Sequence, residues 1–409
     1  MRFKYLFLIV VFLSVSSLYS RQPKAGTYRA LLFLHPDQNI QLPFSFELAY
    51  KNKKPFIVIR NAEEKIQVDE IRIRKDSIYI RMPFFNSEFR CKFTENTLEG
   101  DWINYYRKEN RSIPFKAMHG DMRRFEEEPG PFDPVLEGRW EVQFRASDGA
   151  LTRAIGLFHH IEQSNYISGT FLTETGDYRY LEGVFTGKKL LLSCFDGSHA
   201  FLFSAELDDK KNLQGQFYSG NHWQESWTAR LNEKASLRDP SKITWSKDPG
   251  AKVSFAFPDT GARIISSDDS VFAGKVMLIQ LMGSWCPNCM DESKYLTELY
   301  KKYHHKGLEI VALAFEKSED FKTAKGYVQR MVNRLGIPYP VLVTQKSGKD
   351  MAMKTFPYLN EITAFPTTLF LNKDHQIVNI HTGFNGPATG HEYEKFVLET
   401  ETLLAELLK

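Results

Sequence analysis

The C-terminal part of this 409-residue chain is organised around the stretch Gly283-Ser284-Trp285-Cys286-Pro287-Asn288-Cys289-Met290. Before it, the short apolar run at 276–281 predicts a buried strand. After it, apolar residues recur at the three- and four-residue spacing of a helix, at Leu296, Leu299, Tyr300 and Tyr303. Cys286 is therefore expected just before this helix or in its first turn.

Two cysteines at the start of a helix have a particular chemistry. The unpaired amides and the positive end of the helix dipole favour an anion. The pKa of Cys286 should therefore be lowered, which makes its thiolate nucleophilic at neutral pH. The two residues between the cysteines let the sulfur of Cys289 reach back and close a small ring. This pattern indicates redox chemistry at a dithiol.

A zinc half-site and an inert disulfide are the competing interpretations of the cysteine pair. A structural zinc site needs about four ligands, and the sequence has neither a second Cys-x-x-Cys nor paired histidines at ligand spacing. His159, His160 and His222 are accordingly expected to be solvated or core histidines. Met290 stands where haem attachment requires a histidine. We predict no metal and no cofactor.

Composition narrows the class of protein. Hydrophobic residues make up 42% of the chain and charged residues 25%, which indicates roughly two to three domains that each bury a core. The net charge is only +3, with acidic and basic residues interspersed, so a nucleic-acid partner is not predicted. The aromatic content of 14% is typical of a β-rich portion.

Residues 1–20 have the pattern of a secretory signal peptide. A basic start precedes a largely apolar run from Tyr5 to Val15, and small residues follow up to Ser20. The alternative is a retained membrane anchor, but the apolar run is well below the ~20 residues that span a bilayer. We expect cleavage near Ser20 and an exported, periplasmic protein. Outside the cytosol, reactive thiols would need a donor to keep them reduced.

Two β-rich units are predicted before the cysteine motif, at 26–117 and 136–232. In the first unit, residues 71–82 alternate strictly around a turn, which indicates a hairpin. Similar features recur at offsets of roughly 112 to 115 residues, which indicates a duplicated domain. The matched features include Gly26-Thr27-Tyr28 with Gly138-Arg139-Trp140, and Phe89, Cys91 and Phe93 with Phe201, Phe203 and Ala205. Each unit is expected to be a small antiparallel sandwich or an open barrel.

Charged, turn-rich linkers are predicted at 118–134 and 233–250. The other two cysteines, Cys91 and Cys194, each continue an alternating strand. They could form a disulfide between the two β units, or they could be buried thiols that act as small hydrophobic residues. The second interpretation is favoured because the two cysteines do not occupy equivalent positions in the two units.

Residues 250–409 show strands that alternate with helices. An apolar run at 307–315 predicts a second buried strand, and 321–335 predicts a helix that ends at Gly336. Further strands are expected at 339–343, 366–371 and 376–380, a brief helix near Met351, and a terminal helix at 392–408. This order predicts an α/β sandwich with a mixed central sheet.

These motifs resemble those of a known family. A Trp-Cys-x-x-Cys turn follows a buried strand, and Phe365-Pro366-Thr367 opens a strand far downstream. Together with the segments 257–259, 274–276, 364–368 and 372–374, they resemble the exported TlpA/ResA-type thiol–disulfide oxidoreductases. The resemblance covers the C-terminal domain only. It implies that residues 250–409 form an α/β thioredoxin-like domain. The predicted architecture is therefore a multidomain chain in which two repeated antiparallel β units precede this domain.

The resemblance implies a role for each matching residue. Cys286 would be the attacking thiolate, and Cys289 would be the resolving thiol of a redox-active disulfide. Trp285 would shield the site, although simple core packing is the alternative. Pro366 would be a cis-proline that faces the disulfide, and Phe365 would present its backbone to an extended substrate segment.

The resemblance also implies a proton relay. Thioredoxin has a buried Asp six residues before its first cysteine, where this chain has Gln280, which takes up no proton. In the ResA-like branch, a Glu three residues after the second cysteine acts as the proton acceptor instead. The matching residue in this chain is Glu292. Such a carboxylate can raise the pKa of Cys289 and accept its proton; the alternative is a surface acid near a helix N-terminus. The Pro-Asn dipeptide between the cysteines departs from the Glu-Pro or Gly-Pro common in these families.

The predicted function is that of an exported thiol–disulfide oxidoreductase that uses its Cys-Pro-Asn-Cys dithiol to reduce disulfides of other exported proteins. An upstream membrane electron donor would re-reduce it. The alternative is a binding protein whose duplicated β region binds the partner, with the thioredoxin-like domain as a redox-inactive scaffold.

Overall fold

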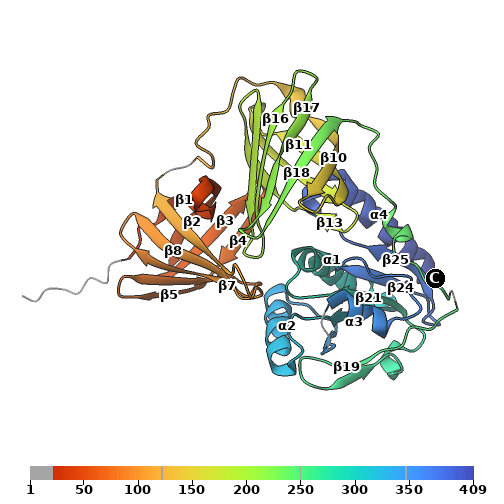
Figure 1. Ribbon diagram of the computed structural model, residues 1–409. Helices are drawn as coiled ribbons and strands as arrows, with labels where there is room; N and C mark the ends of the chain where they lie inside the picture. The colour runs from red at the N-terminus through yellow and green to blue at the C-terminus, as the bar shows by residue number, and fades with distance from the viewer. Residues whose placement is uncertain (1–21, 121–122, 249, 346–347) are drawn as a thin grey trace, which may run out of the picture.

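The computed structural model describes residues 22–120, 123–248, 250–345 and 348–409. The predicted signal peptide, residues 1–20, lies outside them. Within these ranges, no helix is both long and apolar enough to cross a membrane. Two all-β parts are followed by an α/β part (Figure 1).

The first part is one antiparallel sheet with the strand order β4-β3-β2-β1-β9-β8-β7-β6-β5. Its strands alternate buried and outward residues, as in β6, where Ile78 and Ile80 face the core. The predicted hairpin is confirmed, because β5 and β6 pair with Ile73 opposite Ile78. The strands are β1 (Gly26–His35), β2 (Ile40–Lys51), β3 (Lys54–Asn61), β4 (Glu64–Val68), β5 (Glu70–Arg74), β6 (Ser77–Arg81), β7 (Ser87–Phe93), β8 (Thr97–Asn104) and β9 (Ser112–His119).

The second part is an antiparallel sheet with the order β11-β10-β18-β17-β16-β15-β14-β12-β13. Because β11 also pairs with β12, this sheet closes on itself, so a barrel rather than a sandwich forms. Large aromatic residues such as Trp140, Phe144 and Phe171 fill its core. The strands are β10 (Gly138–Ala146), β11 (Leu151–His160), β12 (Tyr166–Thr173), β13 (Gly176–Asp177), β14 (Leu181–Phe185), β15 (Lys189–Phe195), β16 (Ala200–Leu207), β17 (Asn212–Ser219) and β18 (Trp223–Leu231).

The strand registers bear on the predicted correspondence between the two sheets. In both sheets the last strand pairs with the first. Gly100 lies opposite Cys91 in the first sheet, and Gly215 lies opposite Ala205 in the second. When the two sheets are matched at these glycines, Cys91 corresponds to Ala205. The sequence comparison matched Cys91 with Phe203 instead. That match is two residues too early in the second sheet, which is one inward-facing residue along the strand. That the two sheets arose by duplication stays a prediction.

Cys91 and Cys194 are both buried free thiols. The interpretation as small hydrophobic residues is therefore confirmed, and the alternative of a disulfide between the β units is wrong. Burial raises the pKa of Cys91 to about 12 and raises that of Cys194 well above its ordinary value. Both thiols are consequently held in the protonated, unreactive form.

The predicted linker at 118–134 is not a loose connection. Arg124 is buried in it, and its guanidinium donates to the carbonyls of Pro43 and Arg60 in the first part. The same group donates to Ser193 and forms an ion pair with Glu182 in the second part. Arg124 therefore fastens the two β sheets to each other.

The third part is a mixed sheet with the order β23-β22-β21-β24-β25, in which β21 runs parallel to β22 and antiparallel to β24. The mixed sheet predicted from sequence is confirmed. Strand β23 is shorter than predicted because Pro340 has no N–H to donate to a ladder. The elements are β19 (Ala256–Pro258), β20 (Ile264–Ser266), β21 (Val276–Met282), α1 (Pro287–Tyr303), β22 (Leu308–Ala314), α2 (Phe321–Leu335), β23 (Val341–Val343), α3 (Gly348–Thr355), β24 (Thr367–Leu371), β25 (Ile377–Thr382) and α4 (His391–Leu407).

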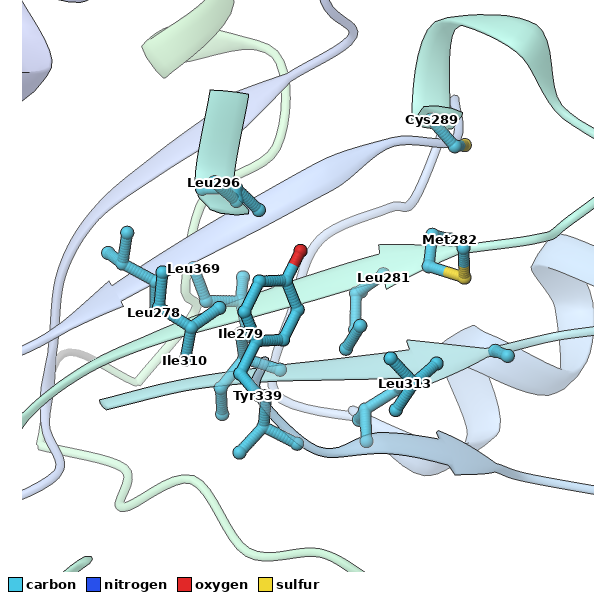
Figure 2. Packing of buried hydrophobic residues seen from close by; sticks show 14 of the residues in the cluster. Leu278, Ile279, Leu281, Met282, Cys289, Leu296, Ile310, Leu313, Tyr339 and Leu369 are labelled. Atoms are coloured by element: carbon cyan, nitrogen blue, oxygen red, sulfur yellow. The ribbon is translucent and has the colours of Figure 1, made fainter. Parts of the chain in front are cut away.

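Packing around β21 holds this part together. Every residue of β21 and of β22 is buried, as expected for strands covered on both faces. Figure 2 shows Leu278 and Leu281 of β21 among side chains from β22, β24 and α1, including Leu296 and Cys289 of α1. The core of the α/β part therefore reaches the base of the cysteine motif.

One buried arginine joins all three parts. Arg179, in the loop after β13, is only 1% exposed and forms ion pairs with Glu64 of β4, Asp196 after β15 and Asp291 of α1. Its guanidinium also donates to the carbonyl of Pro287, inside the cysteine motif. Arg179 thus contributes to holding the three parts together near that motif.

The contacts of Arg179 generate a stability prediction. The substitution Arg179→Met keeps most of the side-chain volume but leaves three enclosed carboxylates without their cation. Breaking a buried ion pair costs about 3–5 kcal/mol, and we expect a loss of this size in the free energy of unfolding by guanidinium chloride. The control is Arg230→Met, since Arg230 is 69% exposed and pairs with Glu141 at the surface. That substitution should cost less than about 1 kcal/mol, and equal losses in the two variants would contradict the account.

Candidate active site

Cys286 is the N-cap residue of helix α1. Its backbone is extended, with φ of −102° and ψ of 113°, and its sulfur accepts the backbone N–H of Cys289 at 3.2 Å. Cys286 and Cys289 form a disulfide, with their Cα atoms 5.2 Å apart. The predicted position of Cys286 at the start of the helix is confirmed. Since neither sulfur titrates in the disulfide, the lowered pKa of Cys286 is a prediction for the reduced protein.

The two cysteines differ in accessibility. Cys286 is 7% exposed and lines a cavity, whereas Cys289 is fully buried against the core. An incoming sulfur can therefore reach Cys286 first, and Cys289 can react only with its neighbour.

Residues far along the chain complete this side of the site. The Phe365–Pro366 peptide bond is cis, as predicted. The carbonyl oxygen of Phe365 lies 3.4 Å from the sulfur of Cys286. Trp285 is half-buried and lines the cavity, its indole N–H donates to the carbonyl of Phe315, and its ring packs edge-on against Phe365. Trp285 is thus both packed and part of the cavity wall.

Glu292 is buried beneath the disulfide, so the alternative that it is a surface acid is wrong. Its carboxylate accepts hydrogen bonds from Gln280 at 2.7 Å and from Thr368 at 2.9 Å. The same Gln280 amide donates to the carbonyl of Cys289 at 3.3 Å, and Gln280 itself accepts from Ser293. Burial raises the pKa of Glu292 to about 7, although its two hydrogen bonds oppose the shift. Glu292 can therefore exchange a proton near neutral pH.

Sequence reasoning missed a second buried acid, Glu316. It lies two residues after the end of β22 and accepts hydrogen bonds from the backbone N–H and the hydroxyl of Ser284, two residues before Cys286. Burial raises its pKa to about 7. The available signal was its place at the end of a buried strand parallel to β21, because the carboxyl ends of parallel strands meet at one edge of a sheet.

The second β part packs directly on the cysteine motif, and the sequence carried no signal for this. The side-chain amide of Asn288 donates to the backbone and side-chain oxygens of Asp177 and to the carbonyl of Phe384. Gly176 has a φ of +132°, and a Cβ there would lie 2.3 Å from the Asn288 amide. Glycine is therefore required by both the backbone conformation and the close approach.

A cavity of about 710 Å³, which we term the Cys286 cavity, opens between the three parts. It is lined by residues of all three, among them Tyr106, Tyr178, Phe201, Trp285, Cys286 and Phe365. Its volume lies within the range of pockets that bind small ligands. The side chain of Cys286 therefore lines an open cavity that the β parts help to form.

Two of the three histidines considered in the sequence, His159 and His160, have hydrogen-bond or ion-pair partners within the second β part. His159 pairs with Glu137, and His160 contacts the carbonyl of Ser164. Burial lowers the pKa of His222 to about 4, with a further contribution from Arg107. In the part of the chain that the structure describes, no group of three or more His, Cys, Asp or Glu side chains is arranged to hold a metal ion.

The family match lies in the C-terminal part of the chain. Residues 248–396 match the family model described as Redoxin. The thiol–disulfide oxidoreductase ResA of Halalkalibacterium halodurans is 30% identical over 115 residues, which cover 27% of this chain and 55% of that protein. ResA of Bacillus subtilis is 26% identical over 149 residues, which cover 36% of this chain and 74% of that protein.

Solved structures with similarity to this part include two thiol–disulfide proteins. One is a putative thiol:disulfide interchange protein DsbE from Chlorobium tepidum, with 20% identity and a TM-score of 0.30, covering 37% of this chain and 96% of that one. The other is the C-terminal domain of a putative thiol-disulfide oxidoreductase from Bacteroides thetaiotaomicron, with 18% identity and a TM-score of 0.29, covering 38% and 95%. The C-terminal part thus contains a Redoxin-type domain that is similar to ResA thiol–disulfide oxidoreductases.

The raised pKa of Glu292 generates a prediction about pH. Glu titrates near 4.3 in an unfolded chain, so the folded state binds this proton more tightly. The contribution of Glu292 to stability is full below about pH 4 and is lost as the pH rises through about 7. The variant Glu292→Gln has no carboxyl group to titrate at this position, so it does not lose this contribution. With both proteins oxidised, the unfolding free energy of the variant minus that of the wild type should therefore rise by about 2–3 kcal/mol between about pH 5 and pH 8.

The control for this measurement is Glu298→Gln. Glu298 lies on the same helix, is 72% exposed and pairs only with Lys301 among the ion pairs described. The difference in unfolding free energy between Glu298→Gln and the wild type should not change over the same pH range. If the difference for Glu292→Gln is also independent of pH, Glu292 is ionised throughout this range, and its raised pKa is contradicted.

Proposed function

We propose that this protein is an exported thiol–disulfide oxidoreductase that reduces disulfides in other exported proteins. The observation that carries the proposal is the asymmetry of the cysteine pair. Cys286 caps helix α1 and lines the cavity, whereas Cys289 is fully buried beside it. One sulfur is thus placed to attack a substrate, and the other to attack the resulting mixed disulfide.

The reaction proceeds in two exchanges. The Cys286 thiolate attacks one sulfur of the substrate disulfide, forms a mixed disulfide and releases the other substrate sulfur as a thiolate. Cys289 then attacks the sulfur of Cys286, forms the enzyme disulfide and releases the second substrate thiolate. Two electrons pass from the enzyme dithiol to the substrate disulfide.

Glu292 is assigned to the second exchange, because Cys289 must lose its proton before it attacks. Glu292 lies one helical turn after Cys289, and Gln280 bridges the Glu292 carboxylate and the Cys289 backbone. A carboxylate with a pKa of about 7 can accept a thiol proton at neutral pH. Cys289 and Glu292 are both buried, so the acceptor is a neighbouring side chain.

Phe365, Pro366 and Trp285 are assigned to substrate binding. The Phe365 carbonyl lies beside the Cys286 sulfur, at the entry to β24. An extended segment next to the substrate cysteine could pair with this backbone. Trp285, which lines the cavity, would contact the same substrate segment.

The proposed location and partners follow from the chemistry. Cysteine-containing exported proteins would be the substrates, in the periplasm after cleavage of residues 1–20. Because this environment oxidises thiols, an upstream membrane electron donor would have to restore the dithiol after each cycle. Neither a metal nor an organic cofactor is required, since the dithiol itself carries the electrons.

The order of the two exchanges can be tested by trapping. In Cys289→Ser the second exchange is blocked because a serine hydroxyl does not attack a disulfide. Reduced Cys289→Ser, incubated with oxidised insulin, should therefore accumulate a close to stoichiometric mixed disulfide that maps to Cys286 and that dithiothreitol removes. The Cys286→Ser variant is the matched control and should form no adduct. Adducts that map to Cys289, or none in either variant, would contradict the proposed function.

A further inference from the structure

Arg107 and Lys317 are two cations that line the Cys286 cavity. Arg107, in the loop after β8, is half-buried, and Lys317 follows β22. The Lys317 ammonium lies 4.0 Å from the centre of the Trp285 ring. The adjacent Glu316 interacts electrostatically with Lys317, but the Glu316 carboxylate is buried and accepts the hydrogen bonds of Ser284. Glu316 is not among the residues that line the cavity, so Arg107 and Lys317 present two positive charges beside the wall that contains Cys286.

The other charged groups of the cavity are already engaged. Among the described lining residues, the one carboxylate is Asp177, which accepts hydrogen bonds from Asn288 and from the backbone of Gly386. Lys349 donates to the carbonyl of Thr363, and His199 pairs with Asp196. The cavity therefore presents an excess of positive charge to whatever enters it.

The two cations also affect each other. Desolvation lowers the pKa of Arg107. Desolvation and the charge of Arg107 lower the pKa of Lys317, and the neighbouring Glu316 opposes that shift. An anion placed between them would relieve both effects, and partial enclosure strengthens such an attraction relative to bulk water.

We propose that the Cys286 cavity selects disulfides in short, extended peptide segments whose cysteine has acidic neighbours. This inference rests on the proposed function and adds a substrate class to it. Arg107 and Lys317 would bind carboxylates on the residues beside the reacting cysteine. The aromatic walls and the Phe365 backbone would hold the segment extended. The two β parts, which contribute Arg107 and Tyr178, would be the specificity elements of the enzyme.

The chemistry balances without an added reactant. The enzyme dithiol supplies two electrons, the Cys286–Cys289 disulfide forms, and the peptide disulfide breaks to give two peptide thiols. The two protons lost by the enzyme thiols are those gained by the peptide thiols. In the test, dithiothreitol prepares the dithiol form and is removed by desalting before the reaction.

The experiment compares three disulfide-linked peptide dimers that differ only beside the cysteine, with the sequences Glu-Cys-Glu, Gln-Cys-Gln and Lys-Cys-Lys. Single-turnover oxidation of the reduced full-length protein gives a second-order rate constant for each. At about 0.01 M ionic strength, where the Debye length is about 30 Å, the Glu peptide should react about tenfold faster than the Gln peptide, and the Lys peptide should react slowest. The ratio of the Glu to the Gln rate constants should fall towards one as salt is added. This salt dependence can be measured on the wild-type protein alone.

The double variant Arg107→Gln/Lys317→Gln should bring the ratio of the Glu to the Gln rate constants close to one. The matched control, Arg111→Gln/Lys322→Gln, removes two exposed positive charges outside the cavity and should keep the wild-type ratio. Equal rates for all three peptides in the wild type, or a ratio that the cavity variant does not change, would overturn this inference and leave the oxidoreductase function standing. Failure of the wild type to reduce any peptide or insulin would overturn the proposed function, and the inference with it.

Discussion

The hydrogen bond from the Cys289 backbone to the Cys286 sulfur is the contact on which the site depends. It makes the sulfur the cap of helix α1, at the point where the positive end of the helix dipole is strongest. That point is fixed in space because β21, buried on both faces, leads directly into the motif. The core of the α/β part therefore determines where the reactive atom lies.

The β parts then determine what surrounds that atom. Asn288 lies between the two cysteines, and its amide binds Asp177 of the second sheet. Arg179 adds ion pairs to both β parts and to α1. The unusual Pro-Asn dipeptide consequently has an explanation in packing, because Asn288 is a contact between parts of the chain as well as a neighbour of the disulfide.

Much of the α/β part could be predicted from sequence because its signals are local. Helical periodicity indicated α1, α2 and α4 to within a residue or two at their ends. Glu292 was singled out by the family resemblance, and its spacing placed it on the same helix face as Cys289. The contacts of Arg179 and Arg124 could not be predicted. Periodicity reports which face of an element is buried, but it does not report which distant element covers that face. The displaced match between Cys91 and Phe203 has the same origin, since only the strand register identifies opposite residues.

The most direct test of the account is the rate at which each cysteine of the reduced full-length protein reacts with iodoacetamide as the pH is varied. Mass spectrometry can assign the modified residue. The account predicts that Cys286 reacts well before Cys289, Cys91 and Cys194, with a midpoint below the value of about 8.5 for a free thiol. Earlier reaction of Cys289, or a midpoint for Cys286 at or above that of a free thiol, would contradict it.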